Sequence, residues 1–136
     1  MLVEGPFGAF TRHKARRRRV TLIGAGVGVT PLLALLEDLD PGVDVSVIVR
    51  ASRSEDLIHR DEIAAQVAAR GGAFHELVGP RQKVRLDSRS LRTLIPGIGQ
   101  SDVFICGPTD FTNVVAAALA KAGVAAGHVH REEFSF

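Results

Sequence analysis

The sequence of 136 residues contains no tryptophan, no tyrosine and a single cysteine, Cys106. One cysteine excludes an internal disulfide and suits a reducing compartment, and the N-terminus has no secretory signal pattern. An uncharged stretch at residues 20–36 is shorter than the ~20 apolar residues of a membrane span and contains three glycines and a proline. We therefore expect a cytoplasmic protein that does not cross a membrane by itself.

Basic residues are concentrated in one short segment. Six of the 17 lysines and arginines lie in residues 12–19, which leaves eleven basic against fifteen acidic residues elsewhere. The run from Arg16 to Arg19 is a candidate nucleic-acid or lipid-headgroup patch. It lacks interleaved aromatics and zinc-finger or recognition-helix spacing, so a solvated basic segment is the favoured interpretation. A non-catalytic nucleotide- or nucleic-acid-binding module that uses this run is the alternative function.

Short apolar segments alternate along the chain with segments of helical periodicity. Strands are expected near residues 20–23, 43–49, 74–78, 102–106 and 128–134, and helices near residues 30–39, 59–70, 88–95 and 109–122. This alternation predicts right-handed β-α-β units and a parallel sheet with helices on both faces. The expected fold class is α/β, a doubly wound five-stranded parallel sheet of the Rossmann-like, nucleotide-binding kind.

A glycine-rich turn follows the first expected strand. Residues 24–31 read Gly-Ala-Gly-Val-Gly-Val-Thr-Pro, which differs from the dinucleotide pattern Gly-x-Gly-x-x-Gly because Val29 occupies the last position. We expect Thr30 to be the N-cap of the next helix and Pro31 its first residue. Glycines let a ligand approach the main chain, and a helix start supplies free N–H groups and a partial positive charge. The turn predicts a pyrophosphate site, with a turn that only packs the helix as the alternative.

A second turn, Cys106-Gly107-Pro108, ends the fourth expected strand. A doubly wound sheet would bring it beside the first glycine turn. Cys106 would there either contact a flat ring or be a small buried hydrophobe. Nucleophilic catalysis is disfavoured because no histidine has a sequence context that pairs with this cysteine.

His128 and His130 alternate along the last expected strand and therefore share a face. Two zinc ligands can share such a face, but no third ligand or metal motif accompanies them. We favour a solvated edge or hydrogen-bonded histidines and expect no metal site.

Four motifs occur in the order found in one known superfamily. They are Gly-Pro-Phe-Gly at residues 5–8, the turn at residues 24–31, Cys-Gly-Pro at residues 106–108 and Glu-Glu-Phe at residues 132–134. Together they resemble the pyridine-nucleotide domain of the ferredoxin–NADP reductase superfamily over essentially the whole chain. Arg-Ser-Glu-Asp-Leu at residues 53–57 and Arg-Asp-Glu at residues 60–62 look most like its bacterial ferric-reductase and NADPH-oxidase branch.

The resemblance implies a domain that receives NAD(P)H and presents the nicotinamide to FAD held by a preceding β-barrel. The flavin motif of that barrel, Arg-x-Tyr/Phe-Ser/Thr, does not occur in this sequence. We therefore expect residues 1–14 to be a linker from an upstream FAD-binding barrel and residues 15–136 to be the NAD(P)-binding domain, inactive without the FAD domain. The implied partners are that FAD domain, the nicotinamide nucleotide and a membrane haem or iron–sulfur acceptor, with no nucleic acid. A longer parent would then hold this domain at the cytoplasmic face of the membrane.

The resemblance also implies roles for individual residues. The three glycines of the first turn, with Thr30, would hold the pyrophosphate and place the nicotinamide ribose. Cys106 and Gly107 would lie against the nicotinamide ring, Glu132 would be the acidic residue near it, and Phe134 or Phe136 would shield the flavin. The expected catalytic residues are Cys106, Glu132 and Phe134, and the expected cofactor-binding residues are Gly24, Gly26, Gly28, Val29, Thr30, Pro31, Arg50, Ser52, Arg53, Cys106, Gly107, Pro108 and Phe136.

The end of the second expected strand bears on the choice of cofactor. A carboxylate at this position bonds the ribose hydroxyls of NADH, whereas a 2′-phosphate requires cations and hydroxyls. The sequence offers Arg50, Ser52 and Arg53 there, with no acid before Glu55. We therefore favour NADP(H) over NAD(H).

Overall fold

The computed structural model describes residues 18–26, 29–80 and 86–134, with only the backbone of residues 133 and 134. Its five strands form one parallel sheet in the order β3-β2-β1-β4-β5. The strands are β1 (Arg19–Ala25), β2 (Asp44–Ala51), β3 (Ala73–Val78), β4 (Asp102–Pro108) and β5 (Val129–Phe134). The α-helices are α2 (Val29–Asp38), α3 (Arg60–Ala69), α4 (Ser88–Leu94) and α5 (Thr109–Lys121). The predicted fold class is confirmed.

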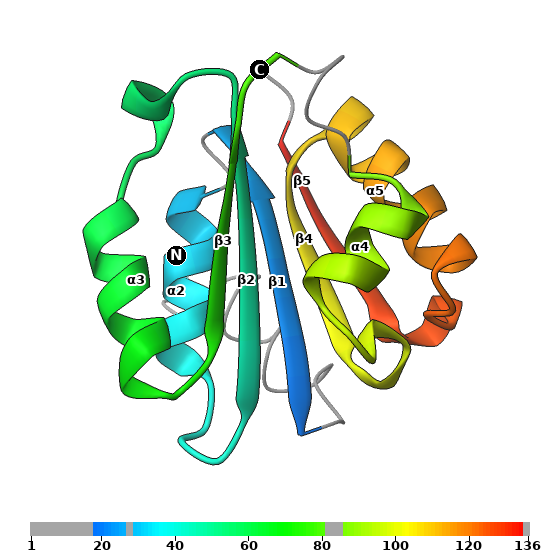
Figure 1. Cartoon of the computed structure of the whole chain (residues 1–136), viewed down its shortest axis with the longest axis horizontal. Coiled ribbons are helices and arrows are strands. Elements are labelled where there is room, and N and C mark those ends of the chain that lie inside the picture. The colour runs from blue at the N-terminus through cyan, green and yellow to red at the C-terminus, as the bar shows by residue number, and fades with distance from the viewer. Residues whose placement is uncertain (1–17, 27–28, 81–85, 135–136) are drawn as a thin grey trace, which may run out of the picture.

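The helices lie in two layers, with α2 and α3 on one face of the sheet and α4 and α5 on the other (Figure 1). From β1 the chain runs outward to β2 and β3 and then returns to the opposite side of β1 to form β4 and β5. The strand order therefore reverses between β1 and β4. In open α/β sheets, ligands bind in the crevice outside the carboxyl ends of the strands at this point.

The three inner strands, β2, β1 and β4, are largely apolar on both faces because helices cover both. Leu22, Val47 and Phe104 belong to the buried cluster beneath α2 and α3. Their chain neighbours Ile23 and Ile48, with Ile105, belong to the cluster beneath α4 and α5. Successive strand residues point to opposite faces, so a nearly continuous apolar run supplies both clusters. None of the described helices is long and apolar enough to span a bilayer.

The start of α2 differs from the sequence prediction. The helix begins at Val29, so Thr30 is its second residue and not its N-cap, and Pro31 is its third residue and not its first. The N–H groups of the first turn have no partner within a helix, so a proline is tolerated at more than one of these positions. The Thr-Pro pair therefore locates the first turn correctly without fixing the first residue.

The two histidines near the start of β5 meet at a buried carboxylate. The Oδ1 atom of the fully buried Asp102 lies 2.8 Å from His128 Nδ1 and 3.3 Å from His130 Nε2. The His130 ring also lies against Phe104, with ring centroids 4.7 Å apart. The hydrogen-bonded interpretation of these histidines is confirmed. Among the described residues, no group of three histidine, cysteine or acidic side chains is arranged to hold a metal ion.

We expect Asp102→Ala to lower the free energy of unfolding by about 3 kcal/mol, because both ring nitrogens would lose a buried acceptor. Urea denaturation followed by circular dichroism measures the change. Asp110→Ala, at an exposed position in the first turn of α5, is the control and should cost less than about 1 kcal/mol. Equal effects of the two substitutions would contradict a stabilising role for this buried cluster.

Candidate functional site

The predicted glycine turn and the Cys106–Pro108 segment lie side by side at the carboxyl edge of the sheet. The segment predicted as a second turn is instead the last part of β4, because its backbone continues to pair with β5. Gly24, near the end of β1, is in register with Cys106 of β4, and β4 continues to Pro108. The chain leaves β1 at Ala25 and enters α2 at Val29, so the start of this helix lies at the same edge. The fold thus brings together the glycine turn, a helix start and the Gly-Pro end of β4.

Gly26 is the residue of the first turn that faces open space. It is exposed, its φ is +59°, and a Cβ added there would meet no atom within 4 Å. A side chain at this φ is strained, whereas glycine adopts it freely. The free space beside the main chain suits a ligand that approaches the backbone.

The start of α2 contributes backbone groups more than side chains. Val29 and Pro31 are buried, so only their main chain faces a ligand, whereas Thr30 is exposed. The first turn of this ten-residue helix carries no acidic side chain. Its N–H groups and helix dipole therefore favour an anion such as a pyrophosphate. Gly28, which belongs to the predicted set, lies outside the described residues, as do Phe136 and the expected linker at residues 1–14.

Cys106 is completely buried in the cluster beneath α2 and α3. Burial, together with the charge of Glu132, raises the pKa of its thiol to about 12. A thiol with this pKa stays protonated at neutral pH, which fits a small buried hydrophobe and does not favour a nucleophile. Its predicted contact with a nicotinamide ring stays a prediction.

Glu132 lies next to Cys106, because the two residues are in register on β5 and β4. Its side chain is half-buried, and desolvation raises the pKa of its carboxyl group above the ordinary value of 4.5. The structure therefore places an acidic group of increased proton affinity at the carboxyl edge, and its predicted place near the nicotinamide stays a prediction. Phe134 ends β5 opposite Pro108, but its side chain is not among the described groups.

The end of β2 holds the three residues expected to select the cofactor. Arg50 lies within the strand and is half-buried, on the same face as Ile48, whereas Ser52 and Arg53 follow the strand and are exposed. A short 3₁₀ helix, Ser54–Asp56, brings Asp56 Oδ2 to 3.5 Å from Arg53 Nε. The sequence has no acid between Arg50 and Glu55, and this pairing was not predicted from it. The turn brings together two residues that are three positions apart.

Two further features of the carboxyl edge were not predicted. Arg60, at the start of α3, pairs with Glu76 of β3 through Nε–Oε2 and Nη2–Oε1 distances of 2.5 and 2.8 Å. Behind Gly107, the ring of Phe111 occupies the space that a side chain at position 107 would need. A glycine at a strand end followed four residues later by an aromatic is a weak sequence signal, because the contact depends on the angle at which α5 leaves β4.

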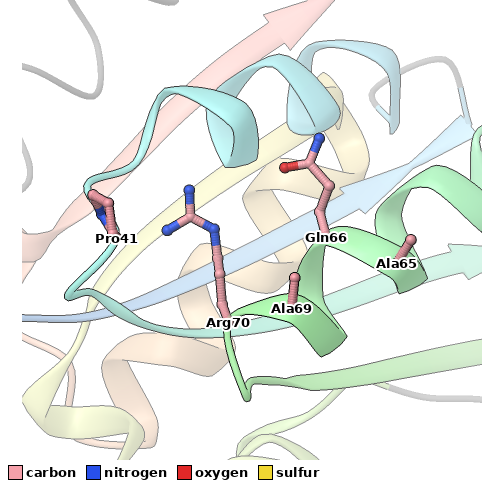
Figure 2. Close-up of a pocket in the computed structure, with 5 residues that line it drawn as sticks. All are labelled: Pro41, Ala65, Gln66, Ala69 and Arg70. Atoms are coloured by element: carbon pink, nitrogen blue, oxygen red, sulfur yellow. The ribbon is translucent and has the colours of Figure 1, made fainter.

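A pocket of about 400 Å³ lies away from this edge, between the ends of α2 and α3 (Figure 2). The Arg70 guanidinium donates hydrogen bonds to the carbonyl oxygens of Leu36, Leu39 and Asp40 at 2.7–3.1 Å. These carbonyls are at the C-terminal end of α2, which a cation stabilises. Helix capping therefore explains the charged group in this pocket. Its remaining lining residues are Pro41, Ala65, Gln66 and Ala69.

Comparisons with known proteins relate the whole chain to reductases. No family model matches the sequence. The reductase subunit of glycine betaine monooxygenase from Chromohalobacter salexigens is 27% identical over 98% of the chain. A flavohemoprotein from Bordetella pertussis is 30% identical over 97% of the chain. The chain spans 40% and 36% of the lengths of these two relatives.

Solved structures give the same result. The flavohem-like FAD/NAD-binding domain of nitric oxide dioxygenase from Vibrio cholerae matches 88% of this chain with a TM-score of 0.74 and 29% identity, and the match covers 52% of that chain. A flavohemoglobin from Malassezia yamatoensis, with bound FAD and haem, matches 92% of this chain with a TM-score of 0.74 and 27% identity, and the match covers 34% of that chain.

The fold is an open, parallel α/β sheet, and its strand reversal is the place where such sheets bind ligands. The relatives and structures show that the chain is similar to part of a ferredoxin–NADP reductase-like NAD(P)/FAD-binding region. The resemblance stated from the sequence is confirmed at this level. The alternative, a module that binds nucleic acid through Arg16 to Arg19, gains no support from the comparisons.

We expect Gly26→Val to weaken the binding of a pyrophosphate-containing nucleotide at least about tenfold, since its side chain would enter the space that the ligand needs. The strained φ should also lower the free energy of unfolding by about 1–2 kcal/mol. Titration calorimetry and urea denaturation measure the two effects. Gly127→Val is the matched control, because Gly127 also has no atom within 4 Å of an added Cβ but lies just before β5. Unchanged binding by the Gly26 variant would exclude the turn as the anion site.

We expect Glu132→Gln to stabilise the protein at pH 7 by less than about 1 kcal/mol, because this half-exposed carboxyl group is partly screened by solvent. The folded protein binds this proton more tightly than the unfolded chain does. The contribution of Glu132 to stability therefore falls as pH rises from below 4.5 through its raised pKa.

The difference between Glu132→Gln and wild type should accordingly disappear below about pH 4. Urea denaturation at a series of pH values measures it, with Glu55→Gln at an exposed position as the control. A stabilisation that grows as the pH is lowered would have the wrong sign and would contradict the raised pKa.

Proposed function

We propose that this chain binds NAD(P)H and positions its nicotinamide for hydride transfer to FAD held by another domain, from which electrons pass onward to an acceptor. The observation that carries the proposal is the meeting of the Gly26 turn, the start of α2 and the Gly107 end of β4 at the strand reversal. The similarity to a monooxygenase reductase subunit and to the FAD/NAD-binding domain of nitric oxide dioxygenase supports it.

The residues present fit such a nucleotide. Gly26 leaves the main chain open, and the first turn of α2 presents N–H groups without a competing acidic side chain. Gly107 is buried and precedes the exposed Pro108 at the end of β4, the edge where a flat ring would lie. The bound cofactors supply the hydride chemistry, while the protein orients the ring and excludes water from it. No general acid or base is required of this chain.

Within this function, we favour NADP(H) over NAD(H). Ser52 and Arg53 are exposed just beyond β2 and would bind the 2′-phosphate. The ion pair between Arg53 and Asp56 does not oppose this, because it is long and both side chains are largely exposed. Exposed pairs of this kind contribute only about 0–1 kcal/mol, whereas a phosphate offers the guanidinium a charge-assisted, bidentate partner.

The acceptor beyond FAD lies outside this chain in the proposal. The motifs at residues 53–57 and 60–62 favour the ferric-reductase and NADPH-oxidase branch, with a membrane haem as acceptor. An iron–sulfur group or a soluble haem domain would accept electrons from the same nucleotide-binding half. A flavohemoprotein and a monooxygenase reductase subunit among the relatives are consistent with acceptors that differ between parent proteins.

Calorimetric titration of the chain with NADP⁺ and with NAD⁺ tests the function and the preference together. We expect Arg53→Asp to weaken NADP⁺ binding about tenfold or more while NAD⁺ binding changes little, because only NADP⁺ carries the 2′-phosphate. Arg89→Asp, on the exposed side of α4, is the control for a general change of charge. Equal weakening for both nucleotides would contradict a 2′-phosphate site at Arg53. No binding at millimolar concentration, even with an FAD-binding domain added, would contradict the function.

A further inference from the structure

The ring of Phe111 lies directly against Gly107, the second-to-last residue of β4. A Cβ added to Gly107 would be 2.9 Å from Phe111 Cδ2, 3.5 Å from Phe111 Cε2 and 3.5 Å from the carbonyl oxygen of Ala25. Carbon atoms in favourable contact lie about 3.5–4.0 Å apart, so the ring already occupies the place of a side chain. The side-chain position of Gly107 is therefore filled by the Phe111 ring and bordered by the end of β1.

This contact comes from the helix that follows the strand. Phe111 is the third residue of α5 and is half-buried, packed against the cluster that contains Ile105 and Val115. Strand alternation places Gly107 on the same face as Ile105, whereas Cys106 points into the cluster on the opposite face. The end of β4 is thus supported on one side by Cys106 and on the other by Phe111.

We infer that Phe111 is a positioning residue for the nicotinamide end of the nucleotide and acts through the main chain of Gly107. The inference rests on the proposed function. A glycine near a strand end packs no side chain of its own and gains backbone freedom, which would let the surface beneath a flat ring shift. The Phe111 ring removes that freedom by filling the space beside Gly107. A ring bound against Gly107 therefore depends on Phe111 without needing to touch it.

A positioning role of Phe111 and a general packing role predict effects on different parts of the nucleotide. The pyrophosphate is expected at Gly26 and the start of α2, and the 2′-phosphate at Ser52 and Arg53, all on segments other than β4 and α5. Loss of Phe111 should therefore change the binding of the nicotinamide and leave the adenosine half unaffected. Loss of general stability would weaken both halves together.

The test compares NADPH with 2′,5′-ADP, an adenine nucleotide that lacks the nicotinamide. We expect Phe111→Ala to weaken NADPH binding about fivefold to tenfold and to leave 2′,5′-ADP within about twofold of wild type. The fluorescence of the reduced nicotinamide, which reports the environment of the ring, should lose its change on binding. Val114→Ala on the exposed side of α5 is the matched control and should alter neither ligand. Phe111→Leu, which keeps an apolar side chain of similar reach, serves if the alanine variant does not fold.

A double-substitution cycle tests the contact itself. Gly107→Ala alone should impair NADPH binding because its methyl group would collide with the Phe111 ring, and this loss should largely disappear in the Phe111→Ala background. Contacting residues give such non-additive effects, whereas independent residues do not. Additive effects, equal weakening of NADPH and 2′,5′-ADP, or no effect of Phe111→Ala would each overturn the inference. Wild-type protein that binds both nucleotides equally would also overturn it. Wild-type protein that binds none of NADPH, NADH and 2′,5′-ADP at millimolar concentration, even with an FAD-binding domain added, would instead overturn the proposed function.

Discussion

The structure depends on the pairing of β1 with β4 at the centre of the sheet. Both strands are covered on both faces, so most of their side chains are apolar, and the groups that a ligand can reach lie where the strands end. Gly24 faces Cys106 in register, and beyond this pair the chain turns away on one side into α2. Because the strand order reverses here, the helices that follow β1 and β4 lie on opposite faces of the sheet (Figure 1). Sheets of this kind bind ligands in the crevice at the carboxyl ends of these strands. This constraint places the Gly26 turn and the Gly107 end of β4 at the same edge of the sheet.

The two glycines meet different physical demands. Gly26 needs a positive φ and has free space around it, so a side chain there costs backbone strain and occupies the space of a ligand. Gly107 lies against Phe111 and the main chain of β1, so a side chain there costs a collision. The space beside Gly26 is open to a ligand, whereas the space beside Gly107 is filled by Phe111. In the proposed function, the flat ring needs a rigid surface, which the end of β4 would supply. The pyrophosphate needs an accessible main chain, which the Gly26 turn would supply.

The sequence predicted the sheet, the meeting of the glycine turn with the Cys106 end of β4, and the resemblance to reductase domains, because these follow from local patterns and from motif order. Apolar runs alternating with amphipathic segments define the strands and helices, and strand ends in a doubly wound sheet must share one edge. It did not predict the Arg53–Asp56 pair, the Arg60–Glu76 pair or the Phe111 contact. The first follows from a 3₁₀ turn, and the other two join residues whose distance is set by how helices pack on the sheet. The start of α2 was misplaced by one to two residues for a local reason, since Thr-Pro is compatible with several positions of a first turn.

The difference between a local sequence pattern and the position that the fold gives each residue also bears on the choice of cofactor. Counting charges along residues 50–55 suggests an uncompensated cationic site, but the fold divides these residues among three environments. Arg50 stays half-buried on the sheet, Ser52 is exposed, and Arg53 is exposed beside Asp56. A long, exposed ion pair is weakened by solvent and salt, so Asp56 reduces the charge that NAD(H) or NADP(H) would meet without holding Arg53 in place. The preference for a 2′-phosphate therefore depends less on the number of cations than on whether one guanidinium can exchange a weak carboxylate partner for a phosphate.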